Sequence, residues 1–105
     1  MISAIVVSYR SAAAARAALA SVRDDARRAG IAAETVCVDN SDDPAEARAL
    51  EGACDRLVVP AGNLGYAGGL NAGIAASRGD VLLLSNPDVV FLAGAVAALA
   101  AAVAG

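Results

Sequence analysis

Short apolar runs alternate along this chain with segments in which apolar residues recur every three or four positions. The first run, residues 2–8 (ISAIVVS), is continuous and rich in β-branched residues, which is typical of a strand buried on both faces of a sheet. Three further runs indicate strands at residues 34–39, 56–60 and 80–84. We therefore expect four short strands, each followed by a helix.

The first two helices have recognisable ends. Ser11 can cap a helix that closes at Gly30, a residue suited to a left-handed helix end. The segment Asp43-Pro44-Ala45-Glu46 combines an acidic cap, a first-turn proline and a glutamate, so it predicts a helix start. This second helix is expected to reach about Ala53, with Ala47 and Leu50 facing inward.

The last two helices are predicted from apolar spacing. A third helix is expected over residues 68–78, packed through Leu70 and Ile74 and closed by Gly79. A closing helix follows, with an apolar stripe of Leu92, Val96, Leu99 and Val103.

Strict alternation of strand and helix predicts the α/β class: an open parallel sheet of about four strands with helices on both faces. We expect residues 1–105 to form a single domain, because no linker, repeat or low-complexity segment interrupts the pattern. The chain is 58% apolar. That fraction reflects its many alanines, or it marks a surface that pairs with another chain or a second copy.

Charge and residue content exclude several kinds of chemistry. The net charge is −3 and no basic run exceeds Arg27-Arg28, so nucleic-acid binding is not expected. The absence of histidine excludes Ser-His-Asp catalysis and histidine-ligated zinc. Cys37 and Cys54 lack metal-ligand spacing, and Cys37 is expected to be a buried, reduced thiol. Neither chain end reads as a signal peptide or a membrane span, so we expect a cytoplasmic protein, free or at the inner membrane face.

Polar residues gather where each predicted strand ends. Since the carboxyl ends of parallel strands share one edge of a sheet, these clusters indicate a ligand site there. A glycine-rich loop lets backbone N–H groups approach a ligand, and a carboxylate can hold a divalent cation. The clusters, in chain order, are Ser8-Tyr9, Asp39-Asn40, Asn63 with Gly65, and Asn86 with Asp88.

Each cluster also has a structural interpretation. Asp39 can belong to a solvated turn, and Tyr9 can be a surface aromatic rather than a ring that stacks on a base. Asn71 can satisfy loop carbonyls, and Asp88 can cap the next segment. Asp80 is expected to start a strand rather than contact ligand. The turn after the first strand lacks the glycines of a dinucleotide-binding fold, and without lysine there is no P-loop.

The motifs IVVSYRS, VCVDNSDD, NLGYAGGLNAGI and RGDVLLLSNPDVV, in this order, resemble the nucleotide-binding half of inverting family 2 glycosyltransferases, which have the GT-A fold. The resemblance covers essentially the whole chain. The Asn-Pro-Asp form most resembles the bacterial rhamnosyltransferase-like branch, whose donors are dTDP- or UDP-sugars.

The resemblance implies roles for matching positions. Asp39 would accept a hydrogen bond from the imide N–H of uracil or thymine. Asn86-Pro87-Asp88 takes the place of the family's Asp-x-Asp motif, so Asp88 alone would supply a carboxylate to Mg²⁺ or Mn²⁺ bound to the diphosphate. The implied nucleotide-binding residues are Ser8, Tyr9, Asp39, Asn63, Gly65, Gly68, Asn71 and Asn86.

The resemblance also implies an activity that this chain would share with a longer protein. The family transfers sugar from the nucleotide to an acceptor hydroxyl, here a glycan or lipid-linked glycan, with an acidic general base from the acceptor-binding part. No catalytic residue is assigned within the 105 residues, so we expect a donor-binding portion that transfers no sugar alone. The alternative is a non-catalytic α/β module that self-associates or pairs with another chain.

Overall fold

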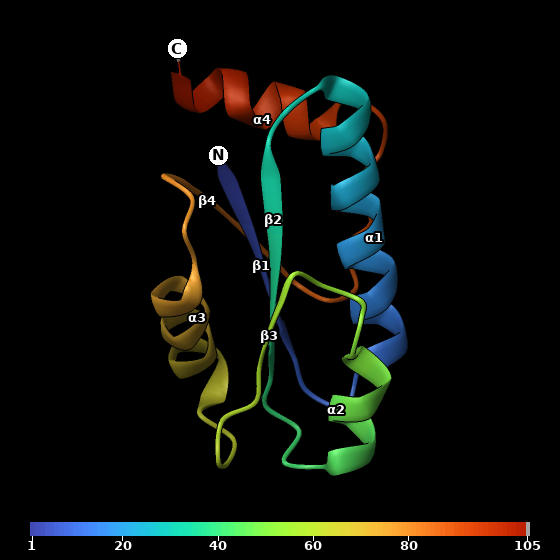
Figure 1. The fold of residues 1–105 in the computed structure, drawn as a ribbon, viewed down its shortest axis with the longest axis vertical. Helices are drawn as coiled ribbons and strands as arrows, with labels where there is room; N and C mark the ends of the chain where they lie inside the picture. The colour runs from blue at the N-terminus through green and yellow to red at the C-terminus, as the bar shows by residue number, and fades with distance from the viewer. Residues whose placement is uncertain (105) are drawn as a thin grey trace.

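The computed structural model describes residues 1–104 and confirms the predicted α/β class. Its described part contains one four-stranded sheet and four helices, alternating along the chain (Figure 1). The elements are β1 (Ile2–Ser8), α1 (Ala12–Ala29), β2 (Ala33–Asp39), α2 (Pro44–Leu50), β3 (Arg56–Val58), α3 (Gly65–Ala76), β4 (Val81–Ser85) and α4 (Ala95–Ala104).

All strand pairs are parallel, and the strand order is β3-β2-β1-β4. The first strand is therefore central, with β2 on one side and β4 on the other. It pairs with β2 along its full length, from Ile2 opposite Ala33 to Ser8 opposite Asp39. The third strand is shorter than predicted and pairs only with residues 36–38 of β2.

The two faces of the sheet carry different helices (Figure 1). Helices α1 and α2 lie on one face and α3 lies on the other. Helix α4 crosses the top of the view and packs on the α1 side, where Val96 meets Val22 and Ala26. On the first face, Val6 and Cys37 pack with Leu19 of α1 and Leu50 of α2. As predicted, Gly30 ends α1 in the left-handed conformation, with a φ of 69°. Helix α2 ends at Leu50, earlier than predicted.

The prediction for α3 was wrong about which residues face the core. Gly69 and Gly73 are buried, whereas Leu70 is only half-buried and Ile74 is exposed. A Cβ on Gly73 would lie 2.5 Å from Ile5 Cγ2, and one on Gly69 would lie 2.8 Å from Val7 Cγ1. The helix approaches β1 too closely for any side chain, and it begins at Gly65 instead of residue 68.

Most of the apolar stripe predicted for the closing helix is exposed, and Leu92 lies outside that helix, because α4 begins at Ala95. Val96 is fully buried, but Leu92, Leu99 and Val103 are 76%, 46% and 68% exposed. Val96, Leu99 and Val103 line an apolar cavity of about 230 Å³ against Val81 and Leu83 of β4. The packing of α4 therefore rests on one large side chain and on polar contacts at its start.

Asp25, buried on α1, supplies those polar contacts. Its carboxylate accepts hydrogen bonds of 2.8 Å from the backbone N–H groups of Gly94 and Val96. Arg28 donates a third, longer bond of 3.3 Å. These donors, Val96 foremost, lower the pKa of Asp25. An acid on one helix thereby caps another, as a carboxylate at a helix N-terminus is expected to do.

A second buried acid, Glu34, lies near the amino end of β2. It accepts bonds of 2.6 Å from the Ser3 hydroxyl and the Arg78 backbone N–H, and one of 3.0 Å from Arg56 Nε. The Ser3 hydroxyl in turn accepts the Gly79 N–H at 2.8 Å. These donors, Ser3 foremost, outweigh burial and lower the pKa of Glu34 to about 2. The network joins β1, β2, β3 and the segment that leads into β4.

Two further predictions concern single residues. Asp80 directly precedes β4, which begins at Val81 rather than at residue 80 as predicted, and its carboxylate pairs with the amino terminus of Met1 at 2.9 Å. Cys37 and Cys54 are free thiols, and burial raises the pKa of Cys37 to about 12. Of the helices described, none has the length and hydrophobicity needed to cross a membrane.

Candidate functional site

The loops that follow the four strands are joined by hydrogen bonds at the carboxyl edge of the sheet. The loops after β1, β2 and β3 meet at the lower end of Figure 1. Arg10 N–H donates to Ser41 Oγ at 2.7 Å, and Asn40 Nδ2 donates to the Gly65 carbonyl at 2.9 Å. Tyr66 extends the series by donating its hydroxyl to Asn86 Oδ1 at 3.2 Å. We call these four linked loops the rim.

Ser8 and Asp39 end neighbouring strands and stand opposite each other in register. Their exposed fractions are 0% and 1%. One Asp39 oxygen accepts the Ser41 backbone N–H at 3.0 Å. The Ser8 hydroxyl and the other Asp39 oxygen find no hydrogen-bond partner within residues 1–104. Buried polar atoms are rarely left unpaired, because each carries a desolvation cost of about 1–3 kcal/mol.

The segment after β1 is held close to this pair. Arg10 has a φ of 52°, a left-handed conformation that is uncommon for a residue with a side chain. Its N–H is fixed by Ser41, and its guanidinium carbon lies 5.5 Å from the centre of the Tyr9 ring. Half of the Tyr9 side chain is exposed. In this conformation Ser8 and Asp39 are closed off from solvent, so a ligand contacts them only after a flanking loop moves.

The glycine-rich loop, residues 63–68, includes the first residues of α3 and is held by hydrogen bonds from both sides. Asn63 Oδ1 accepts the Gly65 N–H at 2.8 Å, and Asn40 Oδ1 accepts the Leu64 N–H at 3.2 Å. Gly65 has a φ of 74° with open space where a Cβ would be, so its backbone conformation requires glycine. A Cβ on Gly68 would instead lie 2.9 Å from Leu64 Cβ, so packing accounts for that glycine.

The Asn86-Pro87-Asp88 turn follows β4, and the side chains of Asn86 and Asp88 are exposed. Within the described residues, no three acidic or cysteine side chains come together as a metal site. A lone accessible carboxylate suits Mg²⁺, which in nucleotide sites takes one or two carboxylates together with phosphate oxygens and water. Asp88 thus fits a metal shared with a phosphorylated ligand, but not one held by protein alone.

The structure brings most predicted site residues to the rim and leaves one apart. Asn71 is exposed on α3, two residues from each of the sheet-facing glycines, so it points away from the sheet. Sequence reasoning missed Ser41, Tyr66 and the side-chain role of Asn40. Asn40 and Ser41 directly follow a predicted strand end, and Tyr66 is an aromatic residue inside the glycine-rich loop. Their positions in the sequence were therefore the signal that could have identified them as site residues.

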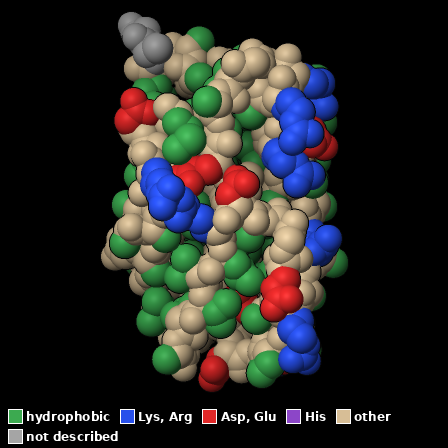
Figure 2. All heavy atoms as spheres, in the orientation of Figure 1, with side chains coloured by type: hydrophobic (Ala, Val, Ile, Leu, Met, Phe, Trp, Pro, Cys, Tyr) green, Lys and Arg blue, Asp and Glu red, His purple; other side chains and the backbone are tan. Residues whose placement is uncertain are grey.

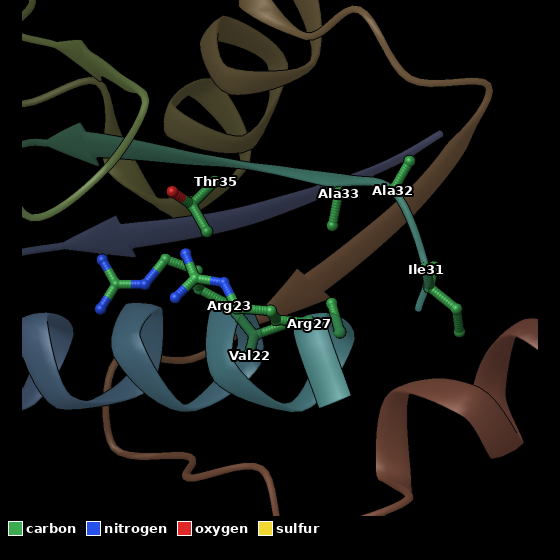
Figure 3. A pocket seen from close by; sticks show the side chains of 8 residues that line it. Val22, Arg23, Arg27, Ile31, Ala32, Ala33 and Thr35 are labelled. Atoms are coloured by element: carbon green, nitrogen blue, oxygen red, sulfur yellow. The ribbon is translucent and has the colours of Figure 1, made fainter. Parts of the chain in front are cut away.

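A separate cleft of about 250 Å³ lies between α1 and the amino-terminal part of β2. Figure 2 shows basic side chains over the upper half of α1, and Figure 3 shows Arg23 and Arg27 extending from that helix toward β2. The rest of its lining is apolar apart from Thr35, whose hydroxyl is already bonded to Asp55. None of the predicted site residues lines this cleft.

Comparison with known proteins identifies the protein family of this chain. The sequence matches Glycosyl transferase family 2 over residues 3–104, and the chain belongs to that family. No curated protein matches the chain.

Solved structures agree with this fold. The crystal structure of S. aureus TarS 1–349 is similar over 95% of this chain, with 20% identity and a TM-score of 0.69. A second S. aureus TarS structure is similar over 96%, with 19% identity and a TM-score of 0.65. The chain spans 31% and 19% of the lengths of those two proteins.

Proposed function

We propose that this chain binds the nucleotide of a UDP- or dTDP-sugar, as the donor-binding portion of a glycosyltransferase. The unpaired Ser8 hydroxyl and Asp39 carboxylate oxygen carry the proposal. They lie at the carboxyl ends of the neighbouring strands β1 and β2, and the strand order turns at β1, with β2 and β3 on one side and β4 on the other. Ligands of open α/β sheets bind at such a switch point.

The unpaired atoms fit a nucleobase. Asp39 Oδ2 is an acceptor, so it suits the imide N–H of uracil or thymine, while Ser8 can donate to or accept from the base or ribose. The exposed ring of Tyr9 is available to stack on the base once the flanking loop moves. Aromatic stacking and a buried carboxylate together would favour a pyrimidine with an imide proton.

The rest of the rim would hold the ribose and diphosphate. The backbone of the glycine-rich loop can approach phosphate oxygens closely at Gly65, where no Cβ intervenes. Asn63 and Gly68 support that loop, and Asn86 offers an exposed amide to the ribose. Asn71 would contribute only if the ligand extends over the outer surface of α3.

Asp88 is the residue proposed to hold Mg²⁺ or Mn²⁺. When bound, the metal would offset negative charge on the departing nucleoside diphosphate. The carboxylate follows β4, next to the switch point, and is accessible. Asn86 in place of the first family aspartate leaves one formal negative charge in the motif, so metal affinity should depend on the diphosphate.

Transfer itself is proposed for a longer protein of the rhamnosyltransferase-like branch, acting in the cytoplasm or at the inner membrane face on a glycan or lipid-linked glycan. Among residues 1–104, the acids outside the rim cap helices, pair with other groups or lie on helix surfaces. None stands as a general base for an acceptor hydroxyl. We therefore propose that this chain alone transfers no sugar.

Calorimetric titration tests the proposal with UDP, dTDP and Mn²⁺. The wild-type chain should bind both nucleotides, more tightly with metal. Asp88→Ala should remove the metal dependence and leave the metal-free affinity unchanged. Asp39→Ala should weaken binding with and without metal, by about tenfold for one lost charge-assisted hydrogen bond. A folded wild-type chain that binds neither nucleotide at millimolar concentration would refute the proposal.

Self-association is a second candidate, favoured by one observation. Strand β4 ends the sheet, and Leu82 and Leu84 on it are 42% and 45% exposed. An unpaired strand edge with apolar side chains can pair with a second copy. Sedimentation velocity should then show a dimer that Leu84→Asp abolishes, whereas a monomer at high concentration would exclude this candidate.

A further inference from the structure

We propose that Asn40 is the positioning residue that holds the glycine-rich loop in place for the diphosphate of the donor; this inference rests on the proposed nucleotide site. Asn40 is 2% exposed, and the resemblance gave no role to its side chain. Its position between the Ser8–Asp39 pair and the glycine-rich loop makes it the direct link between the two halves of the rim.

Asn40 is hydrogen-bonded both to β1 and to the glycine-rich loop. Its backbone N–H donates to the Ser8 carbonyl at 2.8 Å, which fixes it beside the Ser8–Asp39 pair. Its side-chain amide accepts from Leu64 N–H at 3.2 Å and donates to the Gly65 carbonyl at 2.9 Å. Both polar groups of the side chain are therefore engaged by the loop rather than directed at a ligand.

Only an amide satisfies both loop partners. A carboxylate accepts but does not donate, so it would face the Gly65 carbonyl without a proton between the oxygens. The space is also limited, because a Cβ on Gly69 would lie 2.8 Å from Asn40 Nδ2. Helix α3 thus packs on Asn40 itself, and the loop that begins the helix is set by the orientation of that one side chain.

The two parts of the nucleotide should depend differently on the Asn40 side chain. The base is proposed to contact Ser8, Tyr9 and Asp39, whereas the hydrogen bonds of the Asn40 side chain within residues 1–104 go to Leu64 and Gly65. The diphosphate is proposed to contact the loop that this side chain holds. Loosening the loop should therefore weaken binding of UDP but leave binding of uridine nearly unchanged.

The experiment measures the Kd of the full 105-residue chain for UDP and for uridine, at fixed Mg²⁺, by NMR titration. Asn40→Asp keeps the acceptor for Leu64 and removes the donor to Gly65. We expect about a tenfold loss of UDP affinity, equivalent to one charge-neutral hydrogen bond in a closed site, with uridine affinity within about twofold of wild type. Asn40→Ala, which removes both bonds, should lose at least as much for UDP.

The control is Ala75→Asp, which adds the same charge at an exposed position near the carboxyl end of α3 and should leave both affinities near wild type. Urea unfolding of each variant shows that the folded chain is the species titrated. Equal losses for UDP and uridine, or no loss for either, would overturn the role of Asn40. A wild-type chain that binds no UDP would instead overturn the proposed function, and this inference with it.

Discussion

Strands β1 and β2 carry a serine opposite an acidic residue twice, once near each end. Ser3 faces Glu34 at the amino end, and Ser8 faces Asp39 at the carboxyl end. In the first pair both carboxylate oxygens and the hydroxyl are hydrogen-bonded. In the second pair the hydroxyl and one oxygen have no partner among the described residues. A buried serine beside a buried acid is thus fully hydrogen-bonded at one end and partly unsatisfied at the other.

Hydrogen-bond satisfaction, rather than burial, therefore separates a structural pair from a candidate ligand site. A satisfied pair stabilises the fold, and its removal should lower the free energy of unfolding. An unsatisfied pair costs stability until a ligand completes it, as expected where function and stability compete. Substitutions at the two ends should therefore have opposite consequences.

The largest effect is expected at the amino end. Glu34→Ala leaves the Ser3 hydroxyl, the Arg78 N–H and the Arg56 guanidinium without their acceptor. Losing a buried, charged acceptor with several donors should lower the free energy of unfolding by about 3 kcal/mol. Urea denaturation followed by circular dichroism measures this. A loss below about 1 kcal/mol would mean that the network is not structural.

The second-largest effect on stability is expected from low pH, through Glu34 at the amino end of the sheet. The pKa of Glu34 is about 2 in the folded chain, against an ordinary value of 4.5. Because the folded pKa is the lower one, the contribution of Glu34 to stability is complete above pH 4.5 and is lost as the pH falls toward 2. Asp25, whose pKa is also lowered, should act in the same direction.

Urea denaturation at a series of pH values between 7 and 2.5 checks this dependence. Glu34→Gln provides the matched control, since it cannot titrate and should show a shallower decline below pH 4.5. Wild-type and control curves with the same slope would contradict the assignment.

The smallest effect on stability is expected at the carboxyl end. Ser8→Ala removes a buried hydroxyl that has no partner in the described chain, so the free energy of unfolding should change by less than about 1 kcal/mol, toward greater stability. UDP affinity should nevertheless fall. Ser3→Ala is the paired control, because it breaks two bonds and should destabilise without changing UDP affinity. If Ser8→Ala and Ser3→Ala lowered the free energy of unfolding equally, the two serine–acid pairs would not differ in their structural role.

The sequence predicted the order and class of the elements because apolar periodicity reports burial directly. It also predicted that Ser8, Asp39, Asn63 and Asn86 would meet at one edge, since parallel strands place their carboxyl ends together. It could not reveal which acids are satisfied. The Glu34 network reaches Arg78, 44 positions along the chain. Nor did periodicity show that α3 packs through Gly69 and Gly73, because helix-to-sheet distance depends on the β-branched residues of β1.

The central position of β1 has a consequence for synthesis. This strand is synthesised well before its second neighbour, β4, which pairs with it only after residues 81–85 have emerged. Met1 and Asp80, which form an ion pair at that boundary, are 79 positions apart. Such distant pairing slows folding, since a long loop must close before the contacts form. Until then the nascent chain exposes an apolar strand edge, so chaperone binding during translation should concentrate on β1.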